Sequence, residues 1–339
     1  MEFYKNIIRP LLFKLPPETA HTFTTTAFRN ASIWKLWNTI NRITDERLKL
    51  SIAGISLDNP IGLAAGFDKN CLFLSGIRSL GFGYIVGGTV TLNPRPGNKY
   101  PRLFRNTKDK ALINALGFPN VGAKEVVRNI QRNPSSPAII SISGLTVGEF
   151  VECAKLIDPL VQGLELNISS PNTVGLRIFH KIETFRNLIQ NINRARNKPL
   201  FVKLPPYYDS ESQHLTFQII KASLEEGIDG FSVANTIPVK DKRLGVGSGG
   251  VSGKPLFETM VRMVQEIRQE IGLRLVINGC GGIFTSDDAI KTFLAGADTV
   301  QIYTGLVYEG PSILFKINQG LLHYLTEHKL KNIALVKGY

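Results

Sequence analysis

The chain has 339 residues, of which 43% are hydrophobic and 20% are charged, the composition of an ordinary globular protein. This length suits one large α/β domain with an appendage, or two domains. The formal net charge of +13 suggests a nucleic-acid partner, but lysines and arginines are spread along the chain and no nucleic-acid-binding motif occurs. Attraction to an anionic membrane surface explains the charge equally well, so composition does not choose between them.

Three widely spaced cysteines, Cys71, Cys153 and Cys280, form no CxxC pair. We therefore expect neither a disulfide framework nor a metal site, and a reducing cytoplasm is the natural setting. No apolar run approaches the ~20 residues that span a bilayer. The N-terminus also lacks the apolar core and cleavage site of a signal peptide.

Residues 1–46 are expected to form two amphipathic helices, separate from the rest of the chain, with a break at Pro16-Pro17. Pro10 would either kink the first helix or mark its true start. Such a pair either packs onto the following domain or lies on a bilayer and admits an apolar ligand. For the second alternative, the apolar surface would come from Phe3, Ile7, Leu11, Leu15, Phe23 and Phe28, with Lys5, Arg9 and Lys14 beside it.

Residues 47–339 are expected to form a second region, in which strands alternate with helices after a small hairpin around Ala53-Gly54. Eight strand-like runs lie at 59–66, 82–91, 138–143, 163–168, 200–204, 230–235, 274–278 and 299–303. Helical patterns between them lie at 68–80, 183–196, 211–226, 255–271, 286–295 and 311–325. This order predicts an α/β fold, a (β/α)8 TIM barrel with an N-terminal helical extension. A doubly wound open sheet is the rival, but it more often has fewer strands and an early GxGxxG.

Polar and glycine-rich clusters follow the predicted strands, on the face where barrel enzymes build their sites. Those after the seventh and eighth strands, at 279–282 and 303–305, are in the positions that cradle a phosphate in phosphate-binding barrels. Glycine there lets the backbone approach an anion closely. After the fourth strand, 167–172 crowds two asparagines and two serines around Pro171. A stretch of this kind can also be only a local turn, because these side chains bond to the nearby backbone.

Together these motifs resemble the dihydroorotate dehydrogenases, and among them the membrane-associated, quinone-using class. The resemblance spans nearly the whole chain and is carried by the motifs at 59–69, 88–91, 94–98, 101–105, 114–118, 167–172, 249–253 and 301–305. It implies an FMN-dependent barrel that oxidises dihydroorotate to orotate in pyrimidine synthesis and passes electrons to a membrane quinone. It also implies a monomer without nucleic-acid partner, bound peripherally at the cytoplasmic face of the cell membrane.

The resemblance assigns roles to individual residues. Ser170 matches the base that takes a proton from substrate C5 while a hydride leaves C6 for the flavin, and it must pass that proton on through water or a neighbouring threonine. The substrate-binding positions are Lys69, Asn114, Gly117, Phe118, Asn167, Asn172, Asn235 and Thr236, rich in amides that donate and accept hydrogen bonds. The flavin-binding positions are Ala65, Lys69, Thr89, Asn167, Lys203, Gly253, Gly282, Tyr303 and Thr304. His21 and Arg105 match residues at the quinone entrance.

The chain departs from the quinone-using class after the third strand. That class usually carries an asparagine-rich Gly-Lys-Asn-Lys run there, whereas this chain has a shorter connection beginning at Ser141. We expect Ser141 or Ser143 to replace the lost flavin-binding amide. Ala234 also replaces a hydroxyl residue often found before Asn235.

Three alternatives stay open at this point. One is a soluble-class dihydroorotate dehydrogenase that uses fumarate or an NAD-linked acceptor; the short connection favours it, while Ser170 opposes it because the soluble class has cysteine there. Another is a reductase acting on uridine in RNA, which would need a catalytic cysteine where none fits. The third is a basic membrane-surface binding module built on an inactive barrel.

Overall fold

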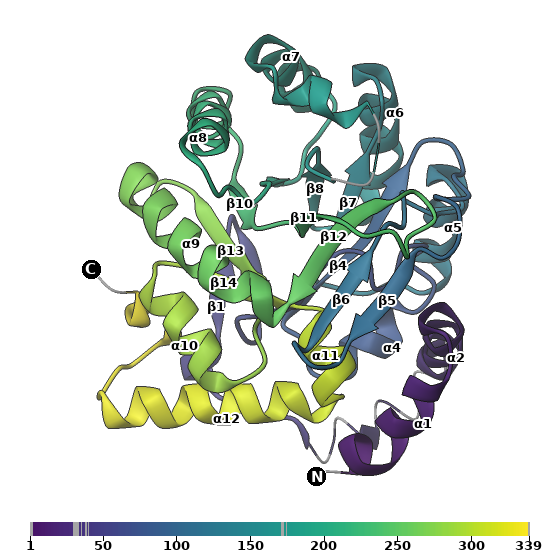
Figure 1. Cartoon of the computed structure of the whole chain (residues 1–339). Helices are drawn as coiled ribbons and strands as arrows, with labels where there is room; N and C mark the ends of the chain where they lie inside the picture. Colours follow the sequence, from purple (N-terminus) through teal and green to yellow (C-terminus); the bar gives the residue numbers. More distant parts are fainter. Residues whose placement is uncertain are drawn as a thin grey trace.

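The structure, a computed structural model, describes residues 3–29, 34, 36–37, 39, 41–170, 173 and 175–337. Eight parallel strands close into a barrel, in which neighbouring strands follow one another in chain order and the last pairs with the first (Figure 1). They are β3 (Ile61–Leu63), β4 (Tyr84–Thr91), β7 (Ala138–Ser143), β8 (Gly163–Asn167), β9 (Leu200–Lys203), β10 (Gly230–Val233), β13 (Val276–Cys280) and β14 (Thr299–Ile302). The predicted barrel is confirmed, and each predicted strand overlaps one of these.

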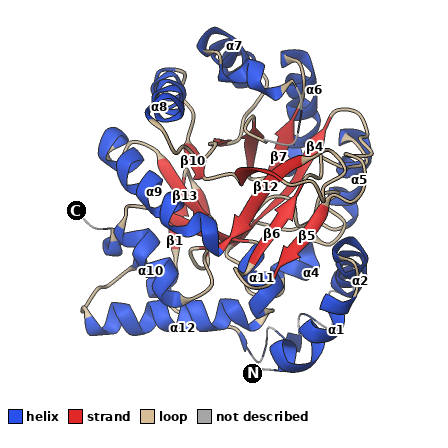
Figure 2. Cartoon of the chain, in the orientation of Figure 1, coloured by secondary structure: helices blue, strands red, loops and turns tan. Residues whose placement is uncertain are grey.

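The barrel strands are buried on both faces, because helices cover the outside and side chains fill the inside. Every residue of β4, β7 and β8 is buried, which is why these strands read as continuous apolar or small-residue runs. Figure 2 shows the helices arranged around the strands. The outer helices are α4 (Leu74–Arg78), α5 (Ala123–Arg132), α6 (Val147–Ile157), α7 (Ile182–Asn193), α8 (Ser210–Glu225), α9 (Phe257–Ile271), α10 (Ser286–Leu294) and α12 (Ser312–Glu327).

Helix α4 is much shorter than the helix predicted at 68–80. The carboxylate of Asp68 accepts hydrogen bonds from the backbone N–H groups of Leu72 and Phe73, both at 2.9 Å. These bonds hold the preceding segment as a turn, so the helix begins only at Leu74. The predicted start of this helix was therefore wrong.

The predicted hairpin closes the floor of the barrel. Strands β1 (Leu50–Ile52) and β2 (Ile55–Leu57) are joined by Ala53 and Gly54, which both have positive φ, as a two-residue hairpin turn requires. The apolar side chains of this hairpin pack against those at the amino ends of the barrel strands. The cluster comprises Ile52, Ile55, Leu57, Tyr84, Val86, Ile139 and Phe201. The opposite end of the barrel is left for polar groups.

A second, antiparallel sheet was not predicted. Its order is β11-β12-β6-β5, with β5 (Leu103–Asn106), β6 (Ala111–Asn114), β11 (Ile237–Lys240) and β12 (Ser248–Gly253). The strands come from the long connections after β4 and β10. Pairing of β12 with β6 sets Asn114 opposite Gly250, so this sheet brings Asn114, Ser252 and Gly253 over the barrel mouth.

The N-terminal helices are a π-helical turn η1 (Tyr4–Ile8), then α1 (Arg9–Lys14) and α2 (Pro17–Arg29). Pro10 lies in the first turn of α1, where its missing N–H is not needed, so it marks a helix start. Phe28 is buried between Phe67 and Phe73 and does not contribute to an exposed apolar surface, contrary to expectation.

The remaining N-terminal apolar side chains behave differently. Phe3, Ile7, Leu11 and Phe23 are all exposed. Within the part of the chain that is described, no helix combines the length and apolarity needed to cross a bilayer.

The N-terminal helices are fixed to the short helix α11 (Thr304–Glu309). The hydroxyl of Tyr4 donates to the backbone oxygen of Val307 at 2.7 Å, and Arg9 donates to that of Tyr308 at 2.9 Å. Lys5 also forms an ion pair with Glu309, at the C-terminal end of the same helix.

A buried arginine fastens α9 to the barrel. The side chain of Arg268 is 4% exposed and forms an ion pair with Asp298. It also donates to three backbone carbonyl groups, those of Gly272, Leu275 and Gly296. The carbonyl of Gly296 lies inside the protein, where a lost donor is not fully replaced by water, and those of Gly272 and Leu275 are half-buried.

We expect Arg268→Ala to lower the free energy of unfolding by about 3 kcal/mol, because it removes the donor to the buried oxygen of Gly296 and the ion pair with the largely buried Asp298. The matched control is Lys291→Ala, which removes an exposed ion pair with Glu258 and should cost less than about 1 kcal/mol. Urea unfolding of both variants measures the difference. Equal losses of unfolding free energy in the two variants would contradict the conclusion that the buried contacts of Arg268 stabilise the packing of α9 on the barrel.

Candidate active site

A cavity of about 1100 Å³, measured out to its open mouth, lies at the carboxyl ends of the barrel strands beneath the second sheet. Its lining contains Ser170 and every described residue that was assigned to substrate or flavin. These are Ala65, Lys69, Thr89, Asn114, Gly117, Phe118, Asn167, Lys203, Asn235, Thr236, Gly253, Gly282, Tyr303 and Thr304. Asn172 lies outside the described residues.

The residues at the end of β8 and just after it form hydrogen bonds with residues at the ends of neighbouring strands, and not only with one another. The hydroxyl of Ser169 donates to the backbone oxygen of Lys203 at 2.8 Å. The amide of Asn235 donates to Ser169 Oγ at 3.0 Å and to Asn167 Oδ1 at 3.3 Å. The local-turn interpretation is therefore wrong for these residues, and the cross-strand bonds leave Ser170 in the cavity wall.

Thr173 follows Ser170 closely in the sequence. Its Oγ1 is buried and has no hydrogen-bond partner among the described residues. A buried hydroxyl of this kind can both donate and accept a hydrogen bond.

Two serines of β7 support the site from behind. Thr89 Oγ1 lies 3.0 Å from the amide nitrogen of Asn167 and 3.1 Å from Ser141 Oγ. The hydroxyl of Ser143 donates to the backbone oxygen of Asn167 at 2.8 Å. Neither serine lines the cavity, so the geometry does not support either as the replacement for the lost amide.

One end of the cavity is built from glycines that tolerate no side chain. A Cβ on Gly282 would lie 2.6 Å from Phe257 Cβ, and one on Gly253 would lie 2.3 Å from the backbone oxygen of Lys110. Both glycines also have positive φ. Beside them, Ser252 Oγ and Thr304 Oγ1 lie 2.9 Å apart. This end therefore offers backbone and hydroxyl groups at close range, as an anion site requires.

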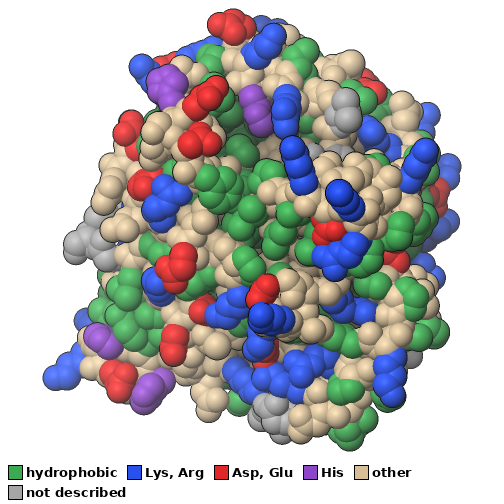
Figure 3. Space-filling model, viewed as in Figure 1, with side chains coloured by type: hydrophobic (Ala, Val, Ile, Leu, Met, Phe, Trp, Pro, Cys, Tyr) green, Lys and Arg blue, Asp and Glu red, His purple; other side chains and the backbone are tan. Residues whose placement is uncertain are grey.

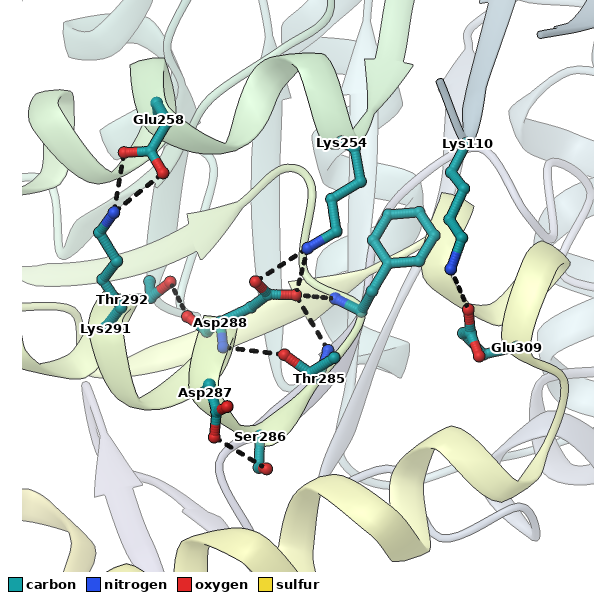
Figure 4. A network of polar contacts seen from close by, with 11 residues as sticks. Lys110, Lys254, Glu258, Thr285, Ser286, Asp287, Asp288, Lys291, Thr292 and Glu309 are labelled. Atoms are coloured by element: carbon teal, nitrogen blue, oxygen red, sulfur yellow. Dashed lines mark hydrogen bonds and ion pairs between the residues drawn. The ribbon is translucent and has the colours of Figure 1, made fainter. Parts of the chain in front are cut away.

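A polar network holds these glycine segments in place (Figure 4). The carboxylate of Asp288 accepts from the backbone N–H groups of Phe284 and Thr285, at 2.8 and 3.0 Å. It also accepts from the ammonium group of Lys254, next to Gly253, at 2.8 Å. Asp288 thus joins the segment after β12 to the segment after β13.

Two lysines bring positive charge to the cavity. Lys203 is 6% exposed, and the exposed part of Lys69 also lines the cavity. Burial lowers the pKa of Lys69 to about 8, although the nearby charges of Glu18 and Asp68 act to raise it. No carboxylate within the described residues lies at ion-pair distance from either ammonium group. An anionic group of a ligand would therefore be the first to pair directly with either ammonium group.

His21 and Arg105 lie outside the cavity lining, at the joint between the N-terminal helices and the barrel. His21 meets Phe67 edge to face, with ring centroids 5.5 Å apart. Burial, and then the charge of Lys69, lower the pKa of His21 to about 3, so its ring is neutral. Arg105 lies over the Phe13 ring at 4.6 Å and donates to the backbone oxygen of Leu15 at 2.8 Å.

Several lining residues were not singled out from the sequence. Gln301 and Cys280 lie within clusters that were recognised, but nothing marked these two side chains. Leu103, Leu112 and Ser252 come from the second sheet, which was itself missed. For Leu103 and Leu112, the available signal was the pair of short apolar runs at 103–104 and 111–113.

Comparisons with known proteins agree with the geometry. A family model described as dihydroorotate dehydrogenase matches residues 47–325. A protein of Roseiflexus sp. named dihydroorotate dehydrogenase (quinone) is 37% identical, over 94% of this chain and 93% of its own. One of Chelativorans sp. with the same name is 33% identical, over 99% and 96%.

Solved structures agree as well. Ligand-free dihydroorotate dehydrogenase from Eimeria tenella superposes with a TM-score of 0.83 at 28% identity, covering 95% of this chain and 98% of its own. The family model and the relatives together span the barrel and the helices before it. The chain therefore belongs to the dihydroorotate dehydrogenase family.

Proposed function

We propose that this protein oxidises dihydroorotate to orotate with bound FMN and passes the electrons to a membrane quinone. The observation that carries the proposal is the set of groups around one cavity: Ser170, the amides of Asn167 and Asn235, and the ammonium groups of Lys69 and Lys203. The relatives named above carry the quinone designation in their names.

The residues present fit a flavin mononucleotide. The glycines at 253 and 282, with Thr304, form an end suited to one phosphate, and Lys203 offers a cation to the ring. When bound, the flavin accepts the hydride that leaves substrate C6. Lys203 would stabilise the negative charge that the reduced ring carries.

Ser170 would remove the proton from substrate C5. A serine hydroxyl is a weak base unless its own proton can move on. Thr173 is the candidate for such a relay, because it follows Ser170 closely in the chain and its buried hydroxyl has no hydrogen-bond partner among the described residues. Asn114, Asn167 and Asn235 would hold the pyrimidine by its carbonyl and N–H groups, which an amide matches.

The N-terminal helices, residues 1–46, would form a quinone-access region, and residues 47–339 the catalytic domain. The exposed Phe3, Leu11 and Phe23 suit insertion into a bilayer surface. Basic side chains gather near the meeting of α11 with these helices, where Lys5 and Lys110 both bind Glu309 (Figure 3). We place the protein as a peripheral monomer on the cytoplasmic face of the membrane.

The purified protein should be yellow and should release FMN, not FAD, when it is denatured. The reason is that the cavity has one glycine-lined end of the kind that holds a single phosphate. Chromatography of the released flavin identifies it, and anaerobic dihydroorotate should bleach the intact protein. Released FAD, or no flavin after reconstitution, would contradict the cofactor assignment.

A further inference from the structure

A carboxylate is buried inside the barrel, directly below the cavity. Glu165 of β8 is 1% exposed. Its Oε2 accepts a hydrogen bond from Ser232 Oγ at 2.6 Å, and its Oε1 has no hydrogen-bond partner in the described part of the chain. A buried carboxylate is costly unless something nearby compensates its charge.

Strand pairing places Glu165 opposite the residue two positions before Lys203, on the side of the barrel away from the cavity. Glu165 lies beside Phe201 of β9, which belongs to the apolar floor, and Lys203 is two residues further along β9 toward the cavity. Ser232, the hydrogen-bond donor to Glu165, lies beside Lys203 on the other side. The carboxylate therefore lies between the apolar floor and the ammonium group that lines the cavity.

Nearby ionisable groups offset the effect of burial on the pKa of Lys203. Burial acts to lower the pKa of Lys203, whereas Cys280 and Glu165 act to raise it when they are ionised, and the net direction is upward. Burial also raises the pKa of the Cys280 thiol and of the Tyr84 hydroxyl, which keeps both groups neutral near pH 7. Ser232 and Gln301, the other side chains close to Glu165, carry no charge. Among the described residues inside the barrel, Glu165 is thus the counter-charge left near Lys203.

We propose that Glu165 is a positioning residue that keeps the Lys203 ammonium group charged and, through it, sets the reduction potential of the bound flavin. The proposal rests on the proposed function, since it requires a flavin in the cavity. The reduced flavin ring carries additional negative charge, so a fixed ammonium group beside it favours reduction. A lysine in this place would lose its proton more easily without the carboxylate below it.

The test is the midpoint potential of the flavin as a function of pH, in the wild-type holoenzyme and in Glu165→Gln. Glutamine keeps the size of the side chain and an oxygen for Ser232. At low pH the variant should have the higher potential, because a negative charge is gone while Lys203 is still charged. As pH rises through the lowered pKa of Lys203, the ammonium group is lost and the variant potential should fall below the wild-type value.

The two curves should therefore cross, with a separation on the alkaline side of at least tenfold in the reduction equilibrium, or about 30 mV for two electrons. Curves that coincide, or a variant curve shifted upward in parallel, would overturn the proposal. In a Lys203→Met background, Glu165→Gln should give no crossing, and a crossing there would also overturn it.

The wild-type curve is decisive by itself if the glutamine variant does not fold. It should have no break from Lys203 between neutral and moderately alkaline pH, because the carboxylate holds the proton on the ammonium group. A break that disappears in Lys203→Met would contradict the proposal. Absence of bound flavin in the wild type would instead count against the proposed function.

Discussion

Ser170→Ala should leave flavin and substrate bound but slow the reduction of the flavin by dihydroorotate about 10²- to 10⁴-fold, the usual loss for a general base. Binding should persist because the adjacent anchoring bonds are made by Ser169, Asn167 and Asn235. The measurement is anaerobic stopped-flow absorbance, with the substrate concentration varied to separate binding from the chemical step.

Two further variants sharpen this experiment. Ser170→Cys should retain more activity than Ser170→Ala, because a thiolate serves as the base in the soluble class. Ser143→Ala is the matched control: it removes a buried hydroxyl that touches the backbone of Asn167 without lining the cavity. A wild-type rate of flavin reduction in Ser170→Ala would mean that another group is the base.

The second large effect concerns the oxidising half of the cycle. We expect the triple variant Phe3→Ser, Leu11→Ser and Phe23→Ser to bind anionic vesicles at least about 10²-fold more weakly, because each apolar side chain contributes about 1.5–3 kcal/mol when buried. Their exposed fractions, 63%, 59% and 61%, mean that the folded protein does not need them for packing. Reoxidation of the flavin by a long-tailed quinone should slow, whereas reduction by dihydroorotate should not.

Deletion of residues 1–46 removes the whole N-terminal region and complements the triple variant. The truncated protein should still bind FMN and accept electrons from dihydroorotate, because every cavity-lining residue that the structure describes follows residue 63. The deletion also removes the contacts of Tyr4, Lys5 and Arg9 with α11, whose first residue, Thr304, lines the cavity. The triple variant keeps those contacts and isolates the exposed apolar surface. Wild-type quinone rates in both proteins would mean that the helices only pack onto the barrel.

The barrel could be predicted because its strands are short apolar runs in regular alternation with amphipathic helices. The second sheet could not, because β12 is the glycine-rich run Ser248–Gly253 and β5 is half-buried along its whole length, so neither has a strand period. Helix α4 was placed too early because the apolar pattern does not reveal that Asp68 bonds to the backbone of Leu72 and Phe73.

The site residues were assigned through the resemblance to the family. Those that follow the carboxyl ends of the barrel strands lie together around the cavity. The sequence motif could not distinguish side chains in the cavity wall from those behind it, as for Ser141 and Ser143. It also gave no reason to notice Glu165, whose role depends on the pairing of β8 with β9 and on the burial of both strands. Such relations between neighbouring strands are three-dimensional and have no local signature.

In the proposed reaction cycle, dihydroorotate reduces the bound flavin and a quinone, rather than a soluble acceptor, reoxidises it. One preparation of the full-length protein, reduced anaerobically with dihydroorotate, should be mixed in turn with a quinone, fumarate, NAD⁺ and oxygen while flavin absorbance is followed. We expect the quinone to restore the oxidised spectrum fastest, by at least about tenfold over each of the others, a difference of about 1.4 kcal/mol in activation free energy. Faster reoxidation by fumarate or NAD⁺ than by the quinone would contradict it.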